Sequence, residues 1–267
     1  MSALGVRAAG GLVVSVTIAI TARKARSLST DGAICATIVG TACVVAGWDW
    51  GTLLIAFFLA STLLSRLGRR LKEHRTRAIV EKGGERDALQ VLANGGLFAL
   101  AAVAYIAHPV TLWQAIGAGA LAASTSDTWA TEVGTMSAAL PRSILTWRPV
   151  PPGTSGGVTA YGTAAGIAGA AFLAGMALLI GWPARVAAAA FIGGVIGSTA
   201  DSLLGATLQA RRRCPECNLA TERLVHSCGA ATTAAGGLGW LTNDGVNAVS
   251  SAIGAVASIW GGAWMPR

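Results

Sequence analysis

Long apolar stretches alternate with short polar segments along most of the chain. These stretches are rich in Ala, Gly, Val and Leu, and most approach the roughly 17–25 residues that a helix needs to cross a bilayer. The pattern predicts an all-α polytopic membrane bundle of about eight spans, within a range of six to eight. The second and third stretches are short, and they could form a tight hairpin or one of them could be re-entrant. The predicted spans are 3–22, 32–47, 51–66, 88–107, 109–126, 158–181, 184–203 and 243–262.

Composition supports a membrane protein. Of the 267 residues, 53% are hydrophobic and only 12% are charged, with a mean hydropathy of +0.59. A soluble domain carries roughly twice that charged fraction. These values argue against a disordered chain, a disulfide-rich secreted domain and a secreted enzyme with a cleaved leader. We expect one membrane-embedded domain over residues 1–267, with its largest polar loop at 204–242.

Basic residues concentrate on one side of the predicted bundle. With eight spans, four loops lie on the same side of the membrane and hold 17 of the 20 Lys and Arg residues. The other three are Arg7, Arg185 and Arg267. The positive-inside rule places these loops in the cytoplasm and both termini outside the cell membrane. The net charge of +8 then reflects contact with anionic lipid rather than nucleic acid. The run 66–86 is interpreted as a helical connector against headgroups, with substrate attraction secondary.

Four acidic residues lie within or beside apolar segments at the predicted cytoplasmic ends, where an ionised carboxylate is costly unless it is paired or metal-bound. Residues 124–128 read Ser-Thr-Ser-Asp-Thr and residues 198–202 read Ser-Thr-Ala-Asp-Ser, each closing a span of the same direction. We interpret this as a degenerate internal repeat that presents an Asp twice at one depth. The four acids are Asp127, Glu132, Asp201 and Asp244.

Helical spacing groups polar side chains beside these acids. Ser198 shares a face with Asp201, and Asn243 shares one with Asn247. Carboxylates and Asn oxygens at one depth suggest a shared cavity and a hard oxygen cage suited to Mg²⁺, although Na⁺ binding or a proton relay would use the same groups. Independent helix caps are the plainer alternative.

The expected Mg²⁺ ligands are three aspartates, and Glu132 is assigned either to an ion pair or to a second ion because it lies about 140° around the helix from Asp127. The aspartates are Asp127, Asp201 and Asp244.

A glycine-rich turn separates the two Asp-bearing segments. Glycines let backbone N–H groups approach an anion, and the following helix start adds a favourable dipole. We expect this turn to bind phosphate, with Arg142 and Arg148 neutralising charge, although membrane helices also use Gly for close packing. The turn is Gly153, Thr154, Ser155, Gly156 and Gly157.

A cysteine–histidine cluster follows the seventh predicted span. Cys-x₂-Cys followed by His-x-Cys matches a tetrahedral Zn²⁺ knuckle, and reduced or redox-active thiols are the alternative. Protein side chains would fill all four positions, so such a zinc would be structural. The expected ligands are Cys214, Cys217, His226 and Cys228.

Several of these blocks resemble one family. The strings SDTWATEVG (126–134), GTSGGVTAYG (153–162), GSTADSLLGATLQ (197–209) and NDGVN (243–247), with the Cys/His cluster, resemble the transmembrane-protein-19-like family, which includes plant and cyanobacterial phytyl-phosphate kinases. The first Asp block and the glycine loop are also distantly similar to phytol and dolichol kinases and CDP-diacylglycerol synthases, which use CTP and Mg²⁺. Their loop usually carries a Lys where this chain offers Arg142 and Arg148.

The resemblance implies a kinase that transfers a phosphoryl group from CTP or another nucleoside triphosphate to an isoprenyl monophosphate. Its partners would be the nucleotide, the isoprenoid lipid phosphate and membrane lipid. The alternatives are a lipid-phosphate cytidylyltransferase, an ion-coupled secondary transporter and a scaffold without chemistry. The nearly all-apolar outer halves of the spans favour a pocket that opens on one side only.

Overall fold

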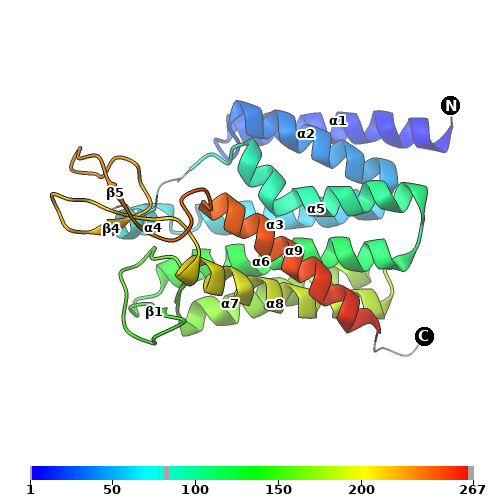
Figure 1. The fold of residues 1–267 in the computed structure, drawn as a ribbon. Coiled ribbons are helices and arrows are strands. Elements are labelled where there is room, and N and C mark those ends of the chain that lie inside the picture. Colours follow the sequence, from blue (N-terminus) through cyan, green and yellow to red (C-terminus); the bar gives the residue numbers. More distant parts are fainter. Residues whose placement is uncertain (1, 78, 81–83, 264–267) are drawn as a thin grey trace.

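A computed structural model describes residues 2–77, 79–80 and 84–263. Within these residues, eight long helices lie roughly side by side, and short strands gather with the longer loops at one end of the bundle (Figure 1). We call this the loop end; it comprises residues 25–29, 66–87, 137–159 and 208–242. The opposite end, where α1 begins and α9 finishes, is called the far end.

The eight predicted spans correspond to the eight long helices, so the all-α prediction is confirmed. Five are long and apolar enough to cross a membrane, namely α1, α3, α5, α7 and α8, and α2 is apolar but shorter. The described helices are α1 (Ala3–Lys24), α2 (Thr30–Ala46), α3 (Trp48–Arg66), α4 (Arg69–Thr76), α5 (Ala88–Ala107), α6 (Thr111–Met136), α7 (Ala160–Leu179), α8 (Ala184–Thr207) and α9 (Asn243–Ala263).

Helix α6 runs ten residues past its predicted end at 126. Its last turns are polar, which suggested a loop from sequence alone, but they contain neither Pro nor a competing cap and remain helical until Ser137. Asp127 and Glu132 therefore lie on a rigid helix. Among the described residues of the connector between α3 and α5, the helical part is α4, which begins after Gly68 in the left-handed conformation (φ +64°).

Two small antiparallel sheets at the loop end were not predicted. In one, β1 (Arg142–Ser143) pairs with β2 (Gly157–Val158). In the other, β3 (Arg211–Arg213) lies between β4 (Ala220–Thr221) and β5 (Thr233–Gly236). Strands this short carry little periodicity, and they form because the surrounding helices bring the extended segments together.

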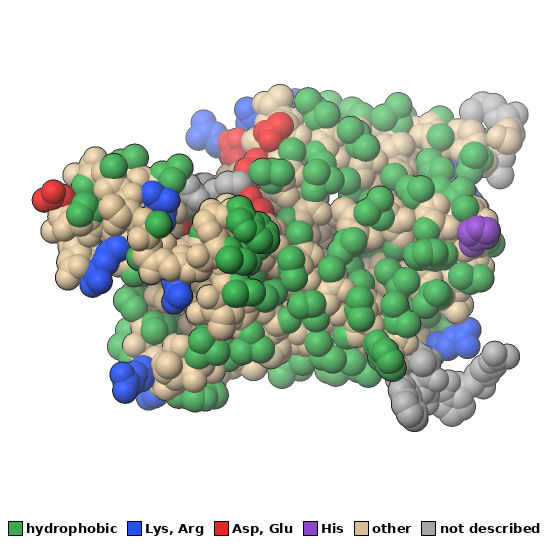
Figure 2. Space-filling model, viewed as in Figure 1, with side chains coloured by type: hydrophobic (Ala, Val, Ile, Leu, Met, Phe, Trp, Pro, Cys, Tyr) green, Lys and Arg blue, Asp and Glu red, His purple; other side chains and the backbone are tan. Residues whose placement is uncertain are grey.

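The four basic loops do gather at the loop end, as hydrogen bonds between them show. Ser29 N donates to Arg86 O at 3.0 Å, and Glu222 N donates to Ile79 O at 2.9 Å. Figure 2 shows hydrophobic side chains covering the middle of the visible face, with charged side chains towards both ends. Two residues of the charge analysis, Lys82 and Arg267, lie outside the described residues.

Helices α6, α8 and α9 approach one another through glycines. A Cβ atom added at Gly197 of α8 would lie 2.4 Å from Ala123 Cβ of α6, and one added at Gly193 would lie 2.4 Å from the Gly254 carbonyl oxygen of α9. Small residues permit this backbone approach in membrane helices. The contact holds the middle turns of α6, α8 and α9 close together.

We predict that Gly197→Ala lowers the melting temperature of the purified protein, because overpacking a tight contact costs about 1–3 kcal/mol. Gly175→Ala in α7 is the matched control, since a Cβ there meets no atom within 4 Å. Thermal unfolding in detergent measures both variants. Equal melting temperatures would contradict the close packing of α6 and α8.

Candidate functional site

The loop end encloses a cavity of about 910 Å³. Its walls are the last turns of α3, α6 and α8, the first turns of α5, α7 and α9, helix α4 and the glycine-rich turn. Every one of these helix segments is the part nearest the loop end, so the cavity opens on one side of the bundle.

Three aspartates from three helices form one wall of this cavity, which we call the acidic wall: Asp127 of α6, Asp201 of α8 and Asp244 of α9. The carboxyl groups of Asp127 and Asp201 lie within hydrogen-bonding range of each other. Asp201 Oδ2 is buried and accepts no hydrogen bond from the described residues. The structure thus brings together acids that are 74 and 43 residues apart along the chain.

The polar residues predicted beside the acids also line this cavity. Ser198 precedes Asp201 by one helical turn, and Asn243 and Asn247 flank Asp244 on the first turn of α9. The wall therefore presents carboxylate, amide and hydroxyl oxygens together, which is the donor set that hard divalent cations prefer.

Hydrogen bonds between helices support the acidic wall from behind. The Ser124 hydroxyl lies 2.9 Å from the Ser251 hydroxyl of α9 and 3.0 Å from the Asn94 carbonyl oxygen of α5. Both serines are buried. These contacts lie one turn before Asp127, so they restrict how α6 can shift relative to α9.

A second wall, which we call the basic wall, faces the cavity from α3, α4 and the segment that leads into α5. At its centre Lys72 forms an ion pair with Glu132 of α6 and donates to the carbonyl oxygens of Leu64 at 3.0 Å and Ser65 at 2.9 Å. The Ser65 hydroxyl donates to Glu132 Oε1 at 2.5 Å. The cations that line the cavity are Arg26, Arg66, Arg69, Lys72, Arg75, Arg86 and Arg212.

Five of these cations lie in the run 66–86, which the sequence predicted to be a connector against lipid headgroups, with substrate attraction secondary. A basic run is most often a connector of that kind. The available signal was the spacing of Arg69, Lys72 and Arg75, which recur every three residues and so lie near one helical face. Only the packing of α4 against α6, through Arg75 Nη1 and the Thr135 carbonyl oxygen at 3.0 Å, turns this face towards the cavity.

The two arginines predicted to contact phosphate are not among the residues that line the cavity. Arg142 and Arg148 are exposed on the β1–β2 hairpin, and Arg142 Nη1 donates to the Trp147 carbonyl oxygen at 2.8 Å. That bond directs the side chain back along its own hairpin. The structure therefore does not bring these two arginines to the cavity, and the cations near the glycine-rich turn come from α4 and from Arg86 before α5.

The glycine-rich turn Gly153–Gly157 does line the cavity. Gly153 (φ +89°) and Gly156 (φ +74°) adopt conformations that favour glycine, and a Cβ at Gly156 would lie 2.4 Å from Ala206 Cβ of α8. The turn therefore lies against α8, close to Asp201. The N–H groups of Thr154 and Gly157 bond within the turn, to the Pro151 and Thr154 carbonyl oxygens.

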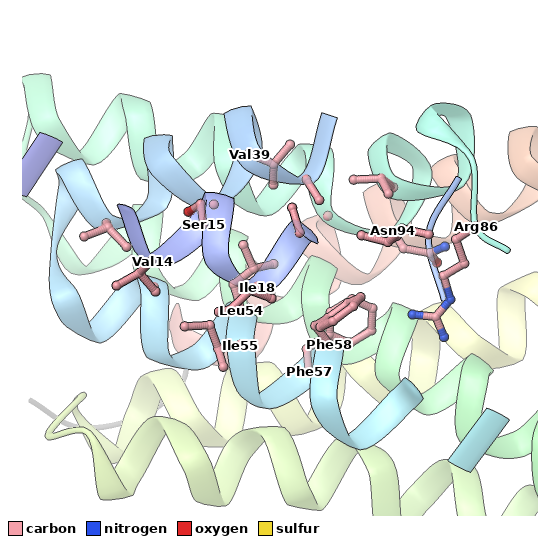
Figure 3. A pocket seen from close by; sticks show the side chains of 18 of the residues that line it. Val14, Ser15, Ile18, Val39, Leu54, Ile55, Phe57, Phe58, Arg86 and Asn94 are labelled. Carbon is pink, nitrogen blue, oxygen red and sulfur yellow. The ribbon is translucent and has the colours of Figure 1, made fainter. Parts of the chain in front are cut away.

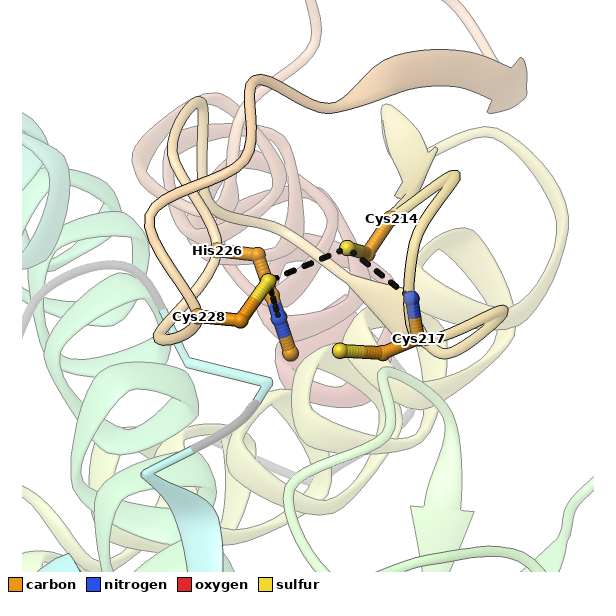
Figure 4. Close-up of side chains that lie close together, drawn as sticks. All are labelled: Cys214, Cys217, His226 and Cys228. Atoms are coloured by element: carbon orange, nitrogen blue, oxygen red, sulfur yellow. Dashed lines mark hydrogen bonds between the residues drawn. The ribbon is translucent and has the colours of Figure 1, made fainter.

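Four metal-binding side chains gather in the loop 208–242. Their ligand atoms all lie within 4.8 Å of one another (Figure 4). Cys214 Sγ is 3.6 Å from Cys228 Sγ, and His226 Nδ1 is 3.2 Å from the same sulfur. Zn–S bonds of about 2.3 Å at tetrahedral angles separate two sulfurs by roughly 3.8 Å, so the spacing fits.

Protonation also favours metal binding at this cluster. The hydrogen bond with His226 lowers the pKa of Cys228 to about 6, so this thiol is largely a thiolate at neutral pH. The neighbouring sulfurs instead raise the pKa of Cys217 to about 11. A thiolate is the form of cysteine that binds metal.

The loop that carries this cluster connects the two walls. Its Glu222 accepts hydrogen bonds from the Ser155 hydroxyl of the glycine-rich turn and from Gln209 Nε2, the latter at 2.7 Å. Arg223 Nη1 donates to the Arg77 carbonyl oxygen at 2.9 Å, just beyond α4. A folded cysteine–histidine loop therefore positions both the glycine-rich turn and the segment after α4.

Fold and cavity together define a mostly helical protein with apolar candidate spans and an oxygen-rich, cation-lined cavity at one end. The chain belongs to the family described as integral membrane protein DUF92, whose model matches residues 13–255. It is therefore a multi-pass membrane protein.

Relatives span distant organisms. The chain is 32% identical to Protein PGR of Arabidopsis thaliana, over 93% of this chain and 95% of that protein. It is 32% identical to an uncharacterized membrane protein of Methanocaldococcus jannaschii, over 74% and 82% of the two chains. It is 25% identical to Protein VTE6, chloroplastic, of Arabidopsis thaliana, over 87% and 64%. No solved structure matches the chain.

We predict that Glu132→Gln destabilises the protein by about 3 kcal/mol, because it leaves the largely buried Lys72 ammonium without its counter-charge. Restoring neutrality in the double variant Lys72→Met/Glu132→Gln should recover part of this loss. Glu73→Gln, which breaks the exposed Arg69–Glu73 pair, should cost less than about 0.5 kcal/mol. Thermal unfolding compares the three, and similar losses from Glu73→Gln and Glu132→Gln would contradict the interpretation.

Proposed function

We propose that this protein is a membrane kinase that transfers a phosphoryl group from CTP or another nucleoside triphosphate to an isoprenyl monophosphate. The observation that carries the proposal is the opposition of two walls across one cavity: carboxylates on α6, α8 and α9, and cations on α3, on α4 and at Arg86 just before α5. A phosphoryl-transfer site needs both, since it binds a divalent cation and several phosphates.

The acidic wall would hold Mg²⁺. Asp127 and Asp201 face each other within a bundle of low dielectric, where two carboxylates repel unless a cation or proton lies between them. Asp244, Asn243 or Asn247 would complete the oxygen set. Bound there, Mg²⁺ would neutralise charge on the transferring phosphoryl group.

The basic wall would hold the phosphates. Arg75 and Arg86 present guanidinium groups that suit phosphate oxygens, while Lys72 supplies a point charge. Glu132 pairs with Lys72 and Glu73 pairs with Arg69, whereas Arg66, Arg75 and Arg86 form no ion pair with the described residues and leave positive charge for an anion. The glycine-rich turn, between this wall and Asp201, would bring its remaining backbone N–H groups to the nucleotide.

The transfer itself requires little from the protein beyond alignment. An oxygen of the lipid monophosphate attacks the γ-phosphorus, the bond from that phosphorus to the β-phosphate oxygen breaks, and CDP leaves with the electron pair. The attacking phosphate is already anionic at neutral pH, so no general base is needed. Positioning and charge neutralisation then account for the rate enhancement.

Two further findings support this proposal. The motif blocks that resemble phytyl-phosphate kinases lie on the cavity, except for the cysteine–histidine cluster, which supports it from outside. The cavity is also confined to the loop end, whereas the far end is packed by Trp50, Phe98 and Trp182, which favours an enzyme over a transporter that opens to both sides. By the positive-inside rule, the loop end would be cytoplasmic and both termini outside.

We predict that purified protein forms an isoprenyl diphosphate from geranylgeranyl or phytyl phosphate with CTP and Mg²⁺. Asp127→Asn and Asp201→Asn should each lower kcat at least about a hundredfold. Asp49→Asn is the control, since Asp49 accepts a hydrogen bond from Trp182 Nε1 at 2.6 Å at the far end, and an amide oxygen can replace it. An absence of diphosphate, or full activity in Asp127→Asn, would refute the proposal.

Labelled CTP separates the kinase from a cytidylyltransferase in the same assay. Attack on the γ-phosphorus releases CDP, whereas attack on the α-phosphorus releases pyrophosphate and joins the nucleotide to the lipid. Release of pyrophosphate would move the assignment to the second reaction.

We also propose that the cysteine–histidine cluster binds a structural Zn²⁺. Three thiolates and one imidazole would fill its coordination sphere, so the ion would hold the loop together and leave no position for substrate. Because this loop contacts Ser155 through Glu222, its folding would set the position of the glycine-rich turn.

Elemental analysis should therefore find about one zinc per chain, and Cys217→Ser with Cys228→Ser should remove it and lower the melting temperature. Cys35→Ser is the control, because Cys35 lies in α2, outside the cluster. Full occupancy by zinc in the double variant, or no zinc in the wild type, would contradict the assignment.

A further inference from the structure

A narrow apolar groove runs along the bundle between α1, α2, α3 and α5 (Figure 3). Its lining is almost entirely hydrocarbon from the middle of these helices, and polar groups occur mainly where it approaches the loop end. The apolar side chains that define it include Val14, Ile18, Val39, Leu54, Ile55 and Phe58.

Helix packing explains why the groove exists. α1 packs against α2 and α2 packs against α5, whereas α3 packs on α2 and α6. Gly95 of α5 lines the resulting space, and a Cβ there would lie 3.7 Å from Val39 Cγ1 and 3.8 Å from Leu54 Cδ1. Gly95 therefore leaves room that an alanine would begin to fill without a clash.

One cation joins this groove to the polar cavity. Arg86 and the neighbouring Gln90 line both of them. Strand-like hydrogen bonds hold the Arg86 backbone, with its N–H donating to the Ser27 carbonyl oxygen at 3.0 Å and its carbonyl oxygen accepting from Ser29 N at 3.0 Å. Its guanidinium donates to Ser65 Oγ at a long 3.3 Å.

The charge balance around Arg86 favours an anion. The nearby carboxylate is Glu132, which also forms the ion pair with Lys72, so two cations share one counter-charge. This half-buried guanidinium makes one long hydrogen bond to the described residues, which leaves donors that phosphate oxygens match in number and geometry.

We infer that this groove binds the prenyl chain of the lipid acceptor, with Arg86 holding the phosphate where groove and cavity meet. The inference rests on the proposed function for the identity of the lipid. An amphiphile with one apolar chain and one anionic head fits a groove that is hydrocarbon along its length and cationic at one end.

The dimensions indicate which part of the chain is bound. Leu28 and Arg86 extend the lining past α2 towards the loop end. Along α2 itself the lining runs from Ala36 to Val44, and eight residues of helix rise about 12 Å. That length holds the isoprene units next to the phosphate, and the rest of a long chain would extend into lipid. One narrow groove fits a single chain better than the paired chains of a phospholipid.

Photocrosslinking tests the inference without relying on turnover. The probe is geranylgeranyl monophosphate with a diazirine in the second isoprene unit from the phosphate, bound to the full-length protein in detergent. We expect crosslinks on groove residues such as Ile18, Leu54 and Phe58, and at least a tenfold loss of crosslinking when unlabelled geranylgeranyl phosphate is in excess. Crosslinks confined to α7 and α8, or competition by phosphatidic acid but not by prenyl phosphate, would overturn it.

A matched pair of glycine variants tests the groove directly. Gly95→Leu should fill it and lower groove crosslinking about tenfold, and it should lower kcat/KM more for geranylgeranyl phosphate than for dimethylallyl phosphate. Gly96→Leu, one residue along α5 and outside the groove, should change neither, since a Cβ there meets only Leu92 of its own helix at 3.7 Å or more. Equal effects of the two variants on crosslinking would refute the inference.

Arg86→Gln should raise KM for the prenyl phosphate at least tenfold and change KM for CTP much less. An equal rise in both values would show that Arg86 does not anchor the acceptor. The crosslinking and activity measurements together also distinguish the proposed kinase activity from the proposed lipid groove. Groove crosslinking without diphosphate formation would refute the kinase and retain the lipid site, whereas activity with crosslinks elsewhere would refute the groove alone.

Discussion

Two carboxylates from different helices face each other in this protein. The packing of the helices that carry them, and the position of the cations across the cavity, are both tied to the closeness of these two groups. In a medium of low dielectric, the repulsion between Asp127 and Asp201 opposes the packing of α6 against α8. The glycine contacts at Gly119, Gly193 and Gly254 hold the helices together despite this repulsion. Such a pair would suit a bound cation or a shared proton, and the cations of α4, with Arg86 before α5, lie across the cavity rather than beside the pair.

The chain divides its chemistry between two groups of helices. The first part, through α5, contributes the basic wall and the apolar groove, and the second part, from α6 to α9, contributes the acidic wall and the glycine-rich turn. The Lys72–Glu132 pair joins the two groups across the cavity, and the cysteine–histidine loop joins them outside it through Arg223 and Glu222. The phosphate of the substrate and the metal ion would therefore meet between the two groups of helices. A small movement of one group of helices relative to the other would change the distance between the phosphate and the metal ion.

Much of the site was visible in the sequence because its residues break local rules. A carboxylate such as Asp201 in a span of Gly and Ala is conspicuous, and so is a Cys-x₂-Cys followed by His-x-Cys. Cations in a basic loop are not conspicuous, because lipid headgroups account for them equally well. Lys72 was missed for that reason, and Arg142, which does not line the cavity, was proposed because nearness in sequence to the glycine-rich turn was taken as nearness in space.

By itself, the sequence determined the helices, their approximate ends and the set of acids that required a partner, since hydropathy and the cost of a charge in hydrocarbon are local properties. Tertiary structure decided the rest. It continued α6 past Asp127, turned α4 towards the cavity, directed Arg142 away and left the groove beside Gly95. These outcomes depend on which helices touch, and contact between helices distant along the chain is set by the shapes of both surfaces together.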